Sequence, residues 1–346
     1  MTRMIVSDDV VSADTGADTG ADTVRPPDSL RASASLRRFA WFVLAYNVLV
    51  ILWGGAVRAT GSGAGCGNQW PLCAGAAIPQ SPQFHTLIEF THRLMSGGAL
   101  LLIVALLLWT WRATCRGHLA RWAAAIALVL VLNEAFLGAL LVTVAAHTAS
   151  PATAVLLFSC HLTNTLLLVA ALALTPEFLS KARLRRTTAL RHGNLFFPAV
   201  GILATLLVGV SGSLVALGET LYPSSSLLAA IRQDFSPAAP LLLRLRWIHP
   251  ASAFLAGAFI AWLLAQSFRR TAPSRARMLG IAVLSTLIAQ YLLGVFDVLL
   301  QAPTWLQIAH LLGANVFWIF LVLLTAGYCL VEASPVSDEI ACEPHA

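Results

Sequence analysis

Long apolar stretches, separated by short polar segments, make up most of the chain. A helix needs about 20 mostly apolar residues to cross the hydrocarbon core of a bilayer. Eight stretches meet this length, at residues 39–58, 86–111, 119–145, 151–174, 195–217, 241–267, 278–299 and 304–331. The pattern therefore predicts an all-α polytopic membrane protein with eight transmembrane helices.

The polar segments differ in charge. Arginines cluster before the first stretch and after the second, fourth and sixth, whereas the alternate segments hold one arginine, Arg232, and no lysine. The positive-inside rule then places both termini in the cytoplasm of a multi-pass protein in the inner (plasma) membrane. The net charge of +6 arises mainly from these arginines, so it gives no indication of nucleic-acid binding. Only 11% of residues are charged, less than half of the usual quarter in soluble domains.

An internal repeat divides the chain into two four-helix halves. The third stretch contains "EAFLG" and the seventh "QYLLG", while "CHLTNT" in the fourth resembles "AHLLGAN" in the eighth. Because four spans return a chain to the same side, the halves should have parallel topology and form two pseudo-repeated four-helix bundles. We expect a disordered cytoplasmic tail at 1–34, a first half at 39–174, a basic cytoplasmic linker at 175–194, a second half at 195–331 and a cytoplasmic tail at 332–346.

Each even-numbered stretch carries one histidine, six to ten residues after the end that follows an arginine-poor segment: His92, His161, His249 and His310. Two imidazoles from neighbouring helices suit the axial positions of a haem, so we predict the pairs His92–His161 and His249–His310. Zinc would require three or four converging ligands. Each half has only two of these histidines, so a zinc site would need ligands from both halves. The other histidines are expected to be solvated or interfacial: His85, His118, His147, His192 and His345.

A carboxylate accompanies the first histidine. Glu89 and His92 lie three residues apart and share one helix face, although a charged acid inside a bilayer costs about 2.5–3.5 kcal/mol. The equivalent position before His249 is Arg246. We therefore expect a reacting haem in the first half, with Glu89 catalytic, and an electron-handling haem in the second. The alternative is that Glu89 only pairs with a nearby arginine, Arg93 or Arg58.

Several other polar groups near or within the spans remain open to two interpretations. Arg58, Arg93, Arg244 and Arg246 either bind haem propionates or extend to the membrane surface. Asn133, Glu134 and Asp297 are explained as well by hydrogen bonds between helices as by function.

Two cysteines lie in the first uncharged segment, "TGSGAGCGNQWPLCAG". Cys66 and Cys73 are seven residues apart on the expected oxidising side, which favours a disulfide. A transient dithiol in redox exchange is the alternative. The remaining cysteines are expected to be free thiols: Cys115, Cys160, Cys329 and Cys342.

Three motifs, "GGAVRATGSGAGC", "WPLC" and "IEFTHR", together with the four histidines, resemble the haem A synthase family of the bacterial CtaA type. The resemblance covers about residues 39–331. It implies an oxidoreductase that converts a ring methyl of haem O to the formyl group of haem A for a terminal oxidase. It also implies that His92 and His161 hold haem O, that His249 and His310 hold a permanent haem b, and that Glu89 is essential.

The resemblance is incomplete in two places. Many bacterial members carry a second cysteine pair between the fifth and sixth spans, and the segment 218–240 has none. The acidic segment "ADTGADTGADT" near the N-terminus is not expected from the family either.

Two other functions fit the same histidines less completely. A two-haem membrane cytochrome acting only in electron transfer would need no acid at Glu89. A transporter would also tolerate parallel repeats and buried charges. As partners we expect haem O, the lipid bilayer, an electron acceptor and the haem O synthase that makes the substrate.

Overall fold

The computed structural model of the chain describes residues 28–80, 83–145, 151–181, 196–269 and 274–329. Within these residues the chain is helical and forms no β-strand. The long helices are α1 (Asp28–Ala59), α2 (Phe84–Ala113), α3 (Leu119–Leu140), α4 (Pro151–Leu179), α5 (Phe196–Leu221), α8 (Ile248–Phe268), α9 (Ser274–Leu299) and α10 (Thr304–Cys329). The short elements are α6 (Leu227–Asp234), α7 (Leu241–Arg244), η1 (Ser62–Ala64) and η2 (Leu141–Ala145).

Eight helical segments among the described residues are long and apolar enough to cross a membrane, as the hydropathy predicts. The observed bounds differ from the predicted ones by a few residues. The first span, for example, is Ala34–Ala59 instead of 39–58. Helices satisfy their own backbone hydrogen bonds, which a bilayer interior requires. The prediction of an all-α polytopic membrane protein is confirmed.

Two of the expected boundaries fall inside helices. Residues 28–34, expected in the N-terminal tail, form the first turns of α1, where alanine, leucine and arginine favour helix. Helix α4 likewise continues to Leu179, into the expected linker. Residues 1–27, 182–195 and 330–346, which include most of the expected tails and linker, lie outside the described part.

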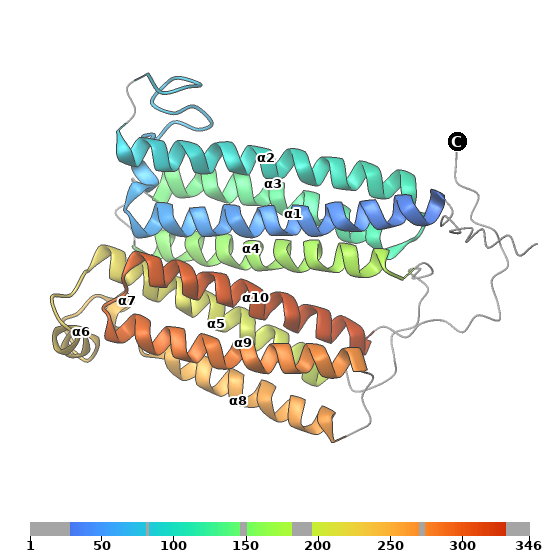
Figure 1. Cartoon of the computed structure of the whole chain (residues 1–346). Coiled ribbons are helices and arrows are strands. Elements are labelled where there is room, and N and C mark those ends of the chain that lie inside the picture. The colour runs from blue at the N-terminus through green and yellow to red at the C-terminus, as the bar shows by residue number, and fades with distance from the viewer. Residues whose placement is uncertain (1–27, 81–82, 146–150, 182–195, 270–273, 330–346) are drawn as a thin grey trace, which may run out of the picture.

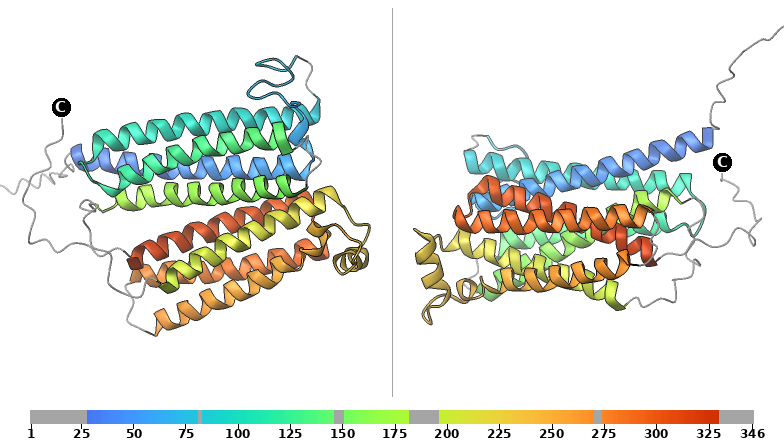
Figure 2. Two further views of the ribbon diagram at one scale, coloured as in Figure 1. Left: turned by 180° about the vertical axis from the view of Figure 1, so that it is seen from behind. Right: turned by 60° about the horizontal axis from the view of Figure 1, so that its bottom comes forward.

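The long helices pack as two groups of four (Figures 1 and 2). Helices α1 to α4 contact one another in the first group, and α5, α8, α9 and α10 in the second. Between the groups, α1 meets α10 and α4 meets α5. Under the sequence repeat α1 corresponds to α5 and α4 to α10, so these two contacts are equivalent. The halves are therefore related by an approximate two-fold axis.

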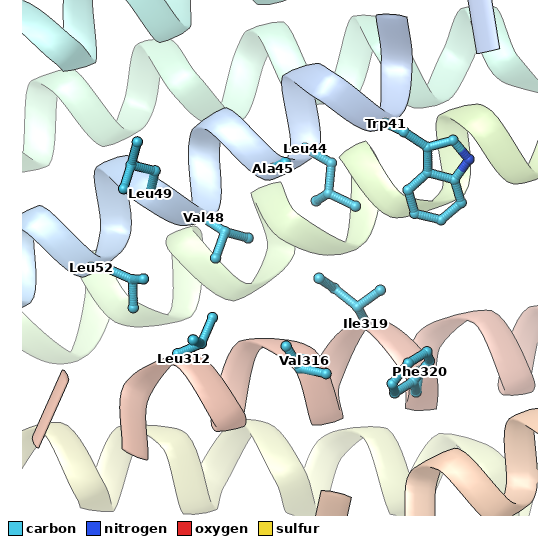
Figure 3. A pocket seen from close by; sticks show the side chains of 10 residues that line it. All are labelled: Trp41, Leu44, Ala45, Val48, Leu49, Leu52, Leu312, Val316, Ile319 and Phe320. Atoms are coloured by element: carbon cyan, nitrogen blue, oxygen red, sulfur yellow. The ribbon is translucent and has the colours of Figure 1, made fainter. Parts of the chain in front are cut away.

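Polar and apolar contacts both contribute to the interface between the halves. The indole Nε1 of Trp318 on α10 donates to the carbonyl of Leu166 on α4 over 2.7 Å. Arg275 of α9 pairs with Glu177 of α4. Between α1 and α10 lies an apolar groove of about 510 Å³ (Figure 3). Its lining contains only apolar side chains and tryptophan, as suits a surface that faces lipid.

One end of the molecule carries the longer connections. The loop of residues 60–80 and helices α6 and α7 gather there (Figure 1), and Cys66 and Cys73 form a disulfide in this loop. We call this end the disulfide end. It is the end that the positive-inside rule places outside the cytoplasm.

The sixth apolar stretch is not one continuous helix. Helix α7 ends at Arg244 and α8 begins at Ile248. Pro250 has no backbone N–H to bond the carbonyl of Arg246, so the regular helical pattern is interrupted there. Arg246 therefore lies in a break and not one turn before His249 on a continuous helix, as the sequence comparison had assumed.

Candidate functional site

Each of the four predicted ligand histidines packs against a glycine of the preceding long helix. A Cβ added at that glycine would lie 3.0 Å (Gly54 to His92), 3.9 Å (Gly138 to His161), 2.8 Å (Gly212 to His249) and 3.4 Å (Gly294 to His310) from the imidazole Cε1. Such distances are short for carbon contacts in three of the four cases. Gly54, Gly212 and Gly294 therefore provide space that the rings occupy, while a Cβ at Gly138 would make an ordinary contact.

The predicted pairs are close enough for their members to influence each other: His92 interacts electrostatically with His161, and His310 with His249. Within the described part of the chain, no three histidine, cysteine or acidic side chains gather as a metal-binding group. Two imidazoles per half, each beside a glycine that leaves room for it, fit the two axial positions of a haem.

The second ring nitrogen differs between the halves. In the second half, His249 Nδ1 lies 3.1 Å from Ser211 Oγ, a contact that fixes the ring and leaves Nε2 for a metal. In the first half, His92 Nδ1 and His161 Nδ1 are buried and have no hydrogen-bond partner among the described residues. Among the described residues, His249 thus has a ring partner that His92 and His161 lack.

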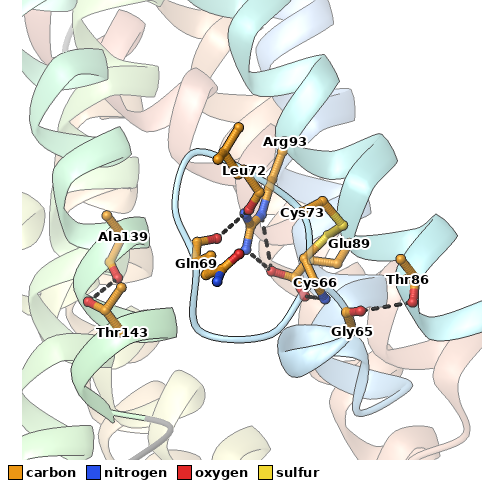
Figure 4. Close-up of polar contacts among 10 residues, drawn as sticks. All are labelled: Gly65, Cys66, Gln69, Leu72, Cys73, Thr86, Glu89, Arg93, Ala139 and Thr143. Atoms are coloured by element: carbon orange, nitrogen blue, oxygen red, sulfur yellow. Dashed lines mark hydrogen bonds and ion pairs between the residues drawn. A yellow bond between two sulfur atoms is a disulfide. The ribbon is translucent and has the colours of Figure 1, made fainter. Parts of the chain in front are cut away.

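Glu89 is buried, with 3% of its surface exposed, and is held on both oxygens. Cys66 N–H donates to Oε2 over 2.8 Å, and the Arg93 guanidinium donates to Oε1 over 2.6 and 3.1 Å. Arg93 also donates to the carbonyls of Gln69 and Leu72 (Figure 4). The structure therefore contains the expected ion pair with Arg93, and it adds direct contacts to the disulfide loop.

Arg58 extends from the first half to the second. Its guanidinium donates to the carbonyl of Ala216 over 2.9 Å, to Thr220 Oγ1 over 3.1 Å and to Gln307 Oε1 over 2.8 Å. Gln307 lies one helical turn before His310 on α10. Arg58 is therefore next to the ligand helix of the second half, although the sequence places it in the first.

The other two arginines predicted to bind propionates behave differently from each other. Arg246 is buried and pairs with Asp234 over 2.7 Å, which ties α6 to the start of α8. Arg244 is exposed at the end of α7. Three of the four predicted guanidiniums thus already bind protein groups, and their role toward propionates stays a prediction.

Glu134 on α3 contacts the first-half site. Its Oε1 lies 3.3 Å from His161 Nε2. Asn133 and Asn164 form a neighbouring hydrogen bond of 2.8 Å between α3 and α4. For Asp297, one carboxylate oxygen is buried without a hydrogen-bond partner among the described residues. Hydrogen bonds between helices, one of the two interpretations of Asn133 and Glu134, are present.

The disulfide between Cys66 and Cys73 is confirmed, and Cys160 is a free cysteine. Cys115, expected to be a free thiol, is instead disulfide-bonded. Among the histidines expected to be solvated, His118 is instead buried, with 6% of its surface exposed. Its Nδ1 accepts from Ala120 N–H and caps α3, which explains the burial. His147, His192 and His345 lie outside the described residues.

Sequence reasoning missed the four glycines and Gln307. The repeat offered part of the signal, because "EAFLG" and "QYLLG" end in Gly138 and Gly294. Nothing in the sequence showed that these glycines face the histidines.

Comparison with known proteins agrees with the family resemblance that the sequence motifs indicate. The family model COX15-CtaA, described as cytochrome oxidase assembly protein, matches residues 37–322. A protein of Thermus thermophilus named protoheme IX farnesyltransferase is 44% identical over 300 residues, 85% of this chain and 48% of that protein. A heme A synthase of an Exiguobacterium species is 42% identical over 101 residues, 29% of this chain and 34% of that protein. A heme A synthase of Exiguobacterium sibiricum is 50% identical over 72 residues, 21% of this chain and 24% of that protein. The match to each of these relatives spans about half of its length or less.

Proposed function

The chain belongs to the COX15-CtaA family of cytochrome oxidase assembly proteins, and from this premise we propose that it is a haem A synthase. Its substrate is haem O, and the reaction oxidises a ring methyl to a formyl group. The observation that carries this proposal is the asymmetry of the two histidine pairs. The buried carboxylate Glu89 lies three residues before His92 in the sequence of α2, whereas Arg246 lies three residues before His249 in the second half.

In the first half, His92 and His161 hold the substrate. Conversion of the methyl to a formyl group, with its oxygen atom taken from water, releases four protons and four electrons. A carboxylate beside the bound haem would assist by accepting a proton or by stabilising positive charge. Glu89 is suited to this role because Arg93 and the Cys66 N–H fix both of its oxygens.

In the second half, His249 and His310 hold a permanent haem b. When bound, haem b supplies one-electron transfer, and the chain's own residues determine how firmly it is held. The Ser211 hydroxyl orients His249, and Gly212 and Gly294 leave room for the two imidazoles.

The orientation in the membrane follows the same proposal. The disulfide lies at the end opposite to the arginine-rich segments, which supports an oxidising compartment on that side and cytoplasmic termini in the plasma membrane. The Thermus relative is named protoheme IX farnesyltransferase, and this chain matches about half of it. A relative with that name supports a haem O synthase, which adds the farnesyl group, as a neighbour that supplies the substrate.

Analysis of the haems extracted from the purified full-length protein tests the function. We expect haem b together with haem O, haem A or a hydroxylated intermediate on reversed-phase separation. Haem b alone, in a protein expressed together with a haem O synthase, would contradict the proposal and indicate a two-haem electron-transfer cytochrome. The lack of any Soret band after expression with adequate haem would indicate a transporter.

A further inference from the structure

The disulfide loop, residues 60–80, folds back beside the first turns of α2 instead of extending beyond the end of this helix (Figures 1 and 2). Arg93 donates to the carbonyls of Gln69 and Leu72 over 2.8 and 2.7 Å. It lies nine residues after Phe84, the first residue of α2, which is about 14 Å along the helix. The loop therefore runs alongside a transmembrane helix over this length.

The contact with Arg93 places part of the loop at the level of the bilayer. Helix α2 has 30 residues, so it is about 45 Å long, whereas the hydrocarbon core is about 30 Å thick. A centred helix then extends about 8 Å into the headgroup layer at each end. Arg93 lies a few ångströms on the acyl side of this boundary, and its long side chain reaches back toward the headgroups. Gln69 and Leu72, whose carbonyls it binds, therefore lie near the boundary itself.

The side chains that the loop exposes suit this layer. Three large apolar ones have between 43% and 69% of their surface exposed: Trp70, Leu72 and Ile78. Tryptophan is enriched where the bilayer meets water. Residues 60–80 contain no aspartate, glutamate, lysine or arginine, although these residue types dominate the surface that proteins expose to water. The loop thus has the composition of a segment that faces lipid.

Around the disulfide, the backbone of the loop finds hydrogen-bond partners within the protein. Cys73 N–H donates to the carbonyl of Ala76 over 2.9 Å, and Ala76 N–H donates to that of Cys73 over 3.1 Å. Ala74 N–H donates to the carbonyl of Cys66 over 2.9 Å, and Arg93 binds two further carbonyls. Non-helical backbone is tolerated at membrane depth only where such partners replace water. This part of the loop meets that condition.

We propose that the disulfide loop is inserted at the boundary between headgroups and acyl chains, where Trp70, Leu72 and Ile78 bind phospholipid. The leaflet is the one at the disulfide end. Exposed Phe84 and Leu87 lie at the start of α2, so the lipid-binding surface of the loop continues that of the span. The loop is then an additional contact with the membrane, outside the eight spans.

The insertion bears on Glu89, because the same loop holds this acid. Cys66 N–H donates to Glu89 Oε2, and Arg93 joins Glu89 Oε1 to the loop carbonyls. Lipid that stabilises the loop against α2 therefore also stabilises the position of the carboxylate. The proposal concerns the place of the loop in the membrane, and it holds or fails whether or not the protein makes haem A.

Fluorine NMR of the full-length protein in phospholipid nanodiscs tests the proposal. The protein is labelled with fluorotryptophan, and the Trp70 signal is the one that disappears in Trp70→Phe. A lipid with a nitroxide near the top of its acyl chain should broaden this signal several times more than a gadolinium chelate in the water does. Trp318 is the control, because it is buried between the halves. Its signal, assigned with Trp318→Phe, should respond least to both agents.

Two results in this experiment would overturn the insertion. Stronger broadening of the Trp70 signal by gadolinium would place the loop in water. A signal protected from both agents would mean that another protein or a second copy of this chain covers the loop. Ile78→p-benzoylphenylalanine supplies a second measurement, because irradiation in the same nanodiscs should attach a phospholipid, detected by mass spectrometry. A cross-linked dimer, or no adduct, would contradict the proposal.

Discussion

The backbone N–H of Cys66 donates a hydrogen bond to Glu89 Oε2 over 2.8 Å, so the disulfide loop directly holds the buried acid (Figure 4). Arg93 completes this connection, because it binds the other oxygen of Glu89 and two loop carbonyls. The oxidation state of the loop and the position of the acid are therefore physically linked.

Replacement of Glu89 tests its role in the reaction. Glu89→Gln keeps the shape of the side chain but removes its charge, and we expect formyl formation to fall about a hundredfold or more. Haem binding, measured from the Soret band, should persist because the histidines are unchanged. Normal haem A formation in this variant would show that the carboxylate is not needed for oxidation.

Loss of the disulfide should affect both stability and activity. The bond closes a loop with a sequence separation of seven residues, for which the chain-entropy relation gives about 2.5 kcal/mol. Cys66→Ser and Cys73→Ser should each lower the thermal midpoint, and the double variant should resemble either one. Haem A formation should fall in parallel, because the loop no longer fixes Glu89.

Reductant provides the control for this comparison. It should lower the midpoint of the unsubstituted protein by more than that of Cys66→Ser, which lacks the loop disulfide but keeps the one at Cys115. Equal midpoints for the oxidised and reduced protein would mean that the loop contributes nothing to stability.

The glycines beneath the imidazoles can be tested one by one. Gly212→Ala would place a methyl group 2.8 Å from His249 Cε1, an overpacking that costs about 1–3 kcal/mol. We expect loss of haem from the second half, measured as haem per chain. Gly97→Ala on α2 is the matched control, because no atom lies within 4 Å of its added Cβ. Full haem content in Gly212→Ala would contradict the assignment of this pocket.

Arg58 should stabilise the association of the two halves. Lysine cannot reproduce its bonds to α5 and α10, because it lacks the planar array of donors. Arg58→Lys should therefore lower the free energy of unfolding by about 2 kcal/mol or more, measured by thermal unfolding in detergent. The exposed Arg232 supplies the control, since Arg232→Lys should have little effect. A midpoint equal to that of the unsubstituted protein would refute the role.

His118 should make stability depend on pH. Burial lowers its pKa below the ordinary 6.5, although a hydrogen bond with the backbone of Lys181 opposes this shift. The unfolded chain then takes up a proton before the folded one, so this contribution is complete above pH 6.5 and is lost as the pH falls toward the lowered pKa. Thermal midpoints between about pH 7.5 and 5.5 should show this loss. His118→Asn keeps a capping side chain but does not titrate. Its thermal midpoint should therefore fall less steeply as the pH is lowered.

The helices and the histidines were predictable from the sequence for a physical reason. A bilayer requires long apolar helices, and this requirement is local in sequence. The recurrence of His92, His161, His249 and His310 in alternate helices was likewise readable without coordinates. The structure confirms the disulfide between Cys66 and Cys73, while the roles of the histidines stay predictions.

Contacts between helices were not predictable. Arg58 lies in the first half of the sequence, yet it binds Gln307 in the second, and only the packing of α1 on α10 brings them together. The burial of His118 depends on its capping contact in the same way. The break before His249 did have a local signal in Pro250, but the apolar pattern alone concealed it.

The equivalence of the α1–α10 and α4–α5 contacts also bears on how such a protein can arise. A single four-helix chain with these surfaces can pair with an identical copy, both inserted in the same orientation, as a symmetric dimer. Gene duplication would preserve that geometry and free each copy to specialise. Carboxylates could then be kept in one copy only, so that one ancestral cytochrome would yield both an oxidising site and its electron outlet.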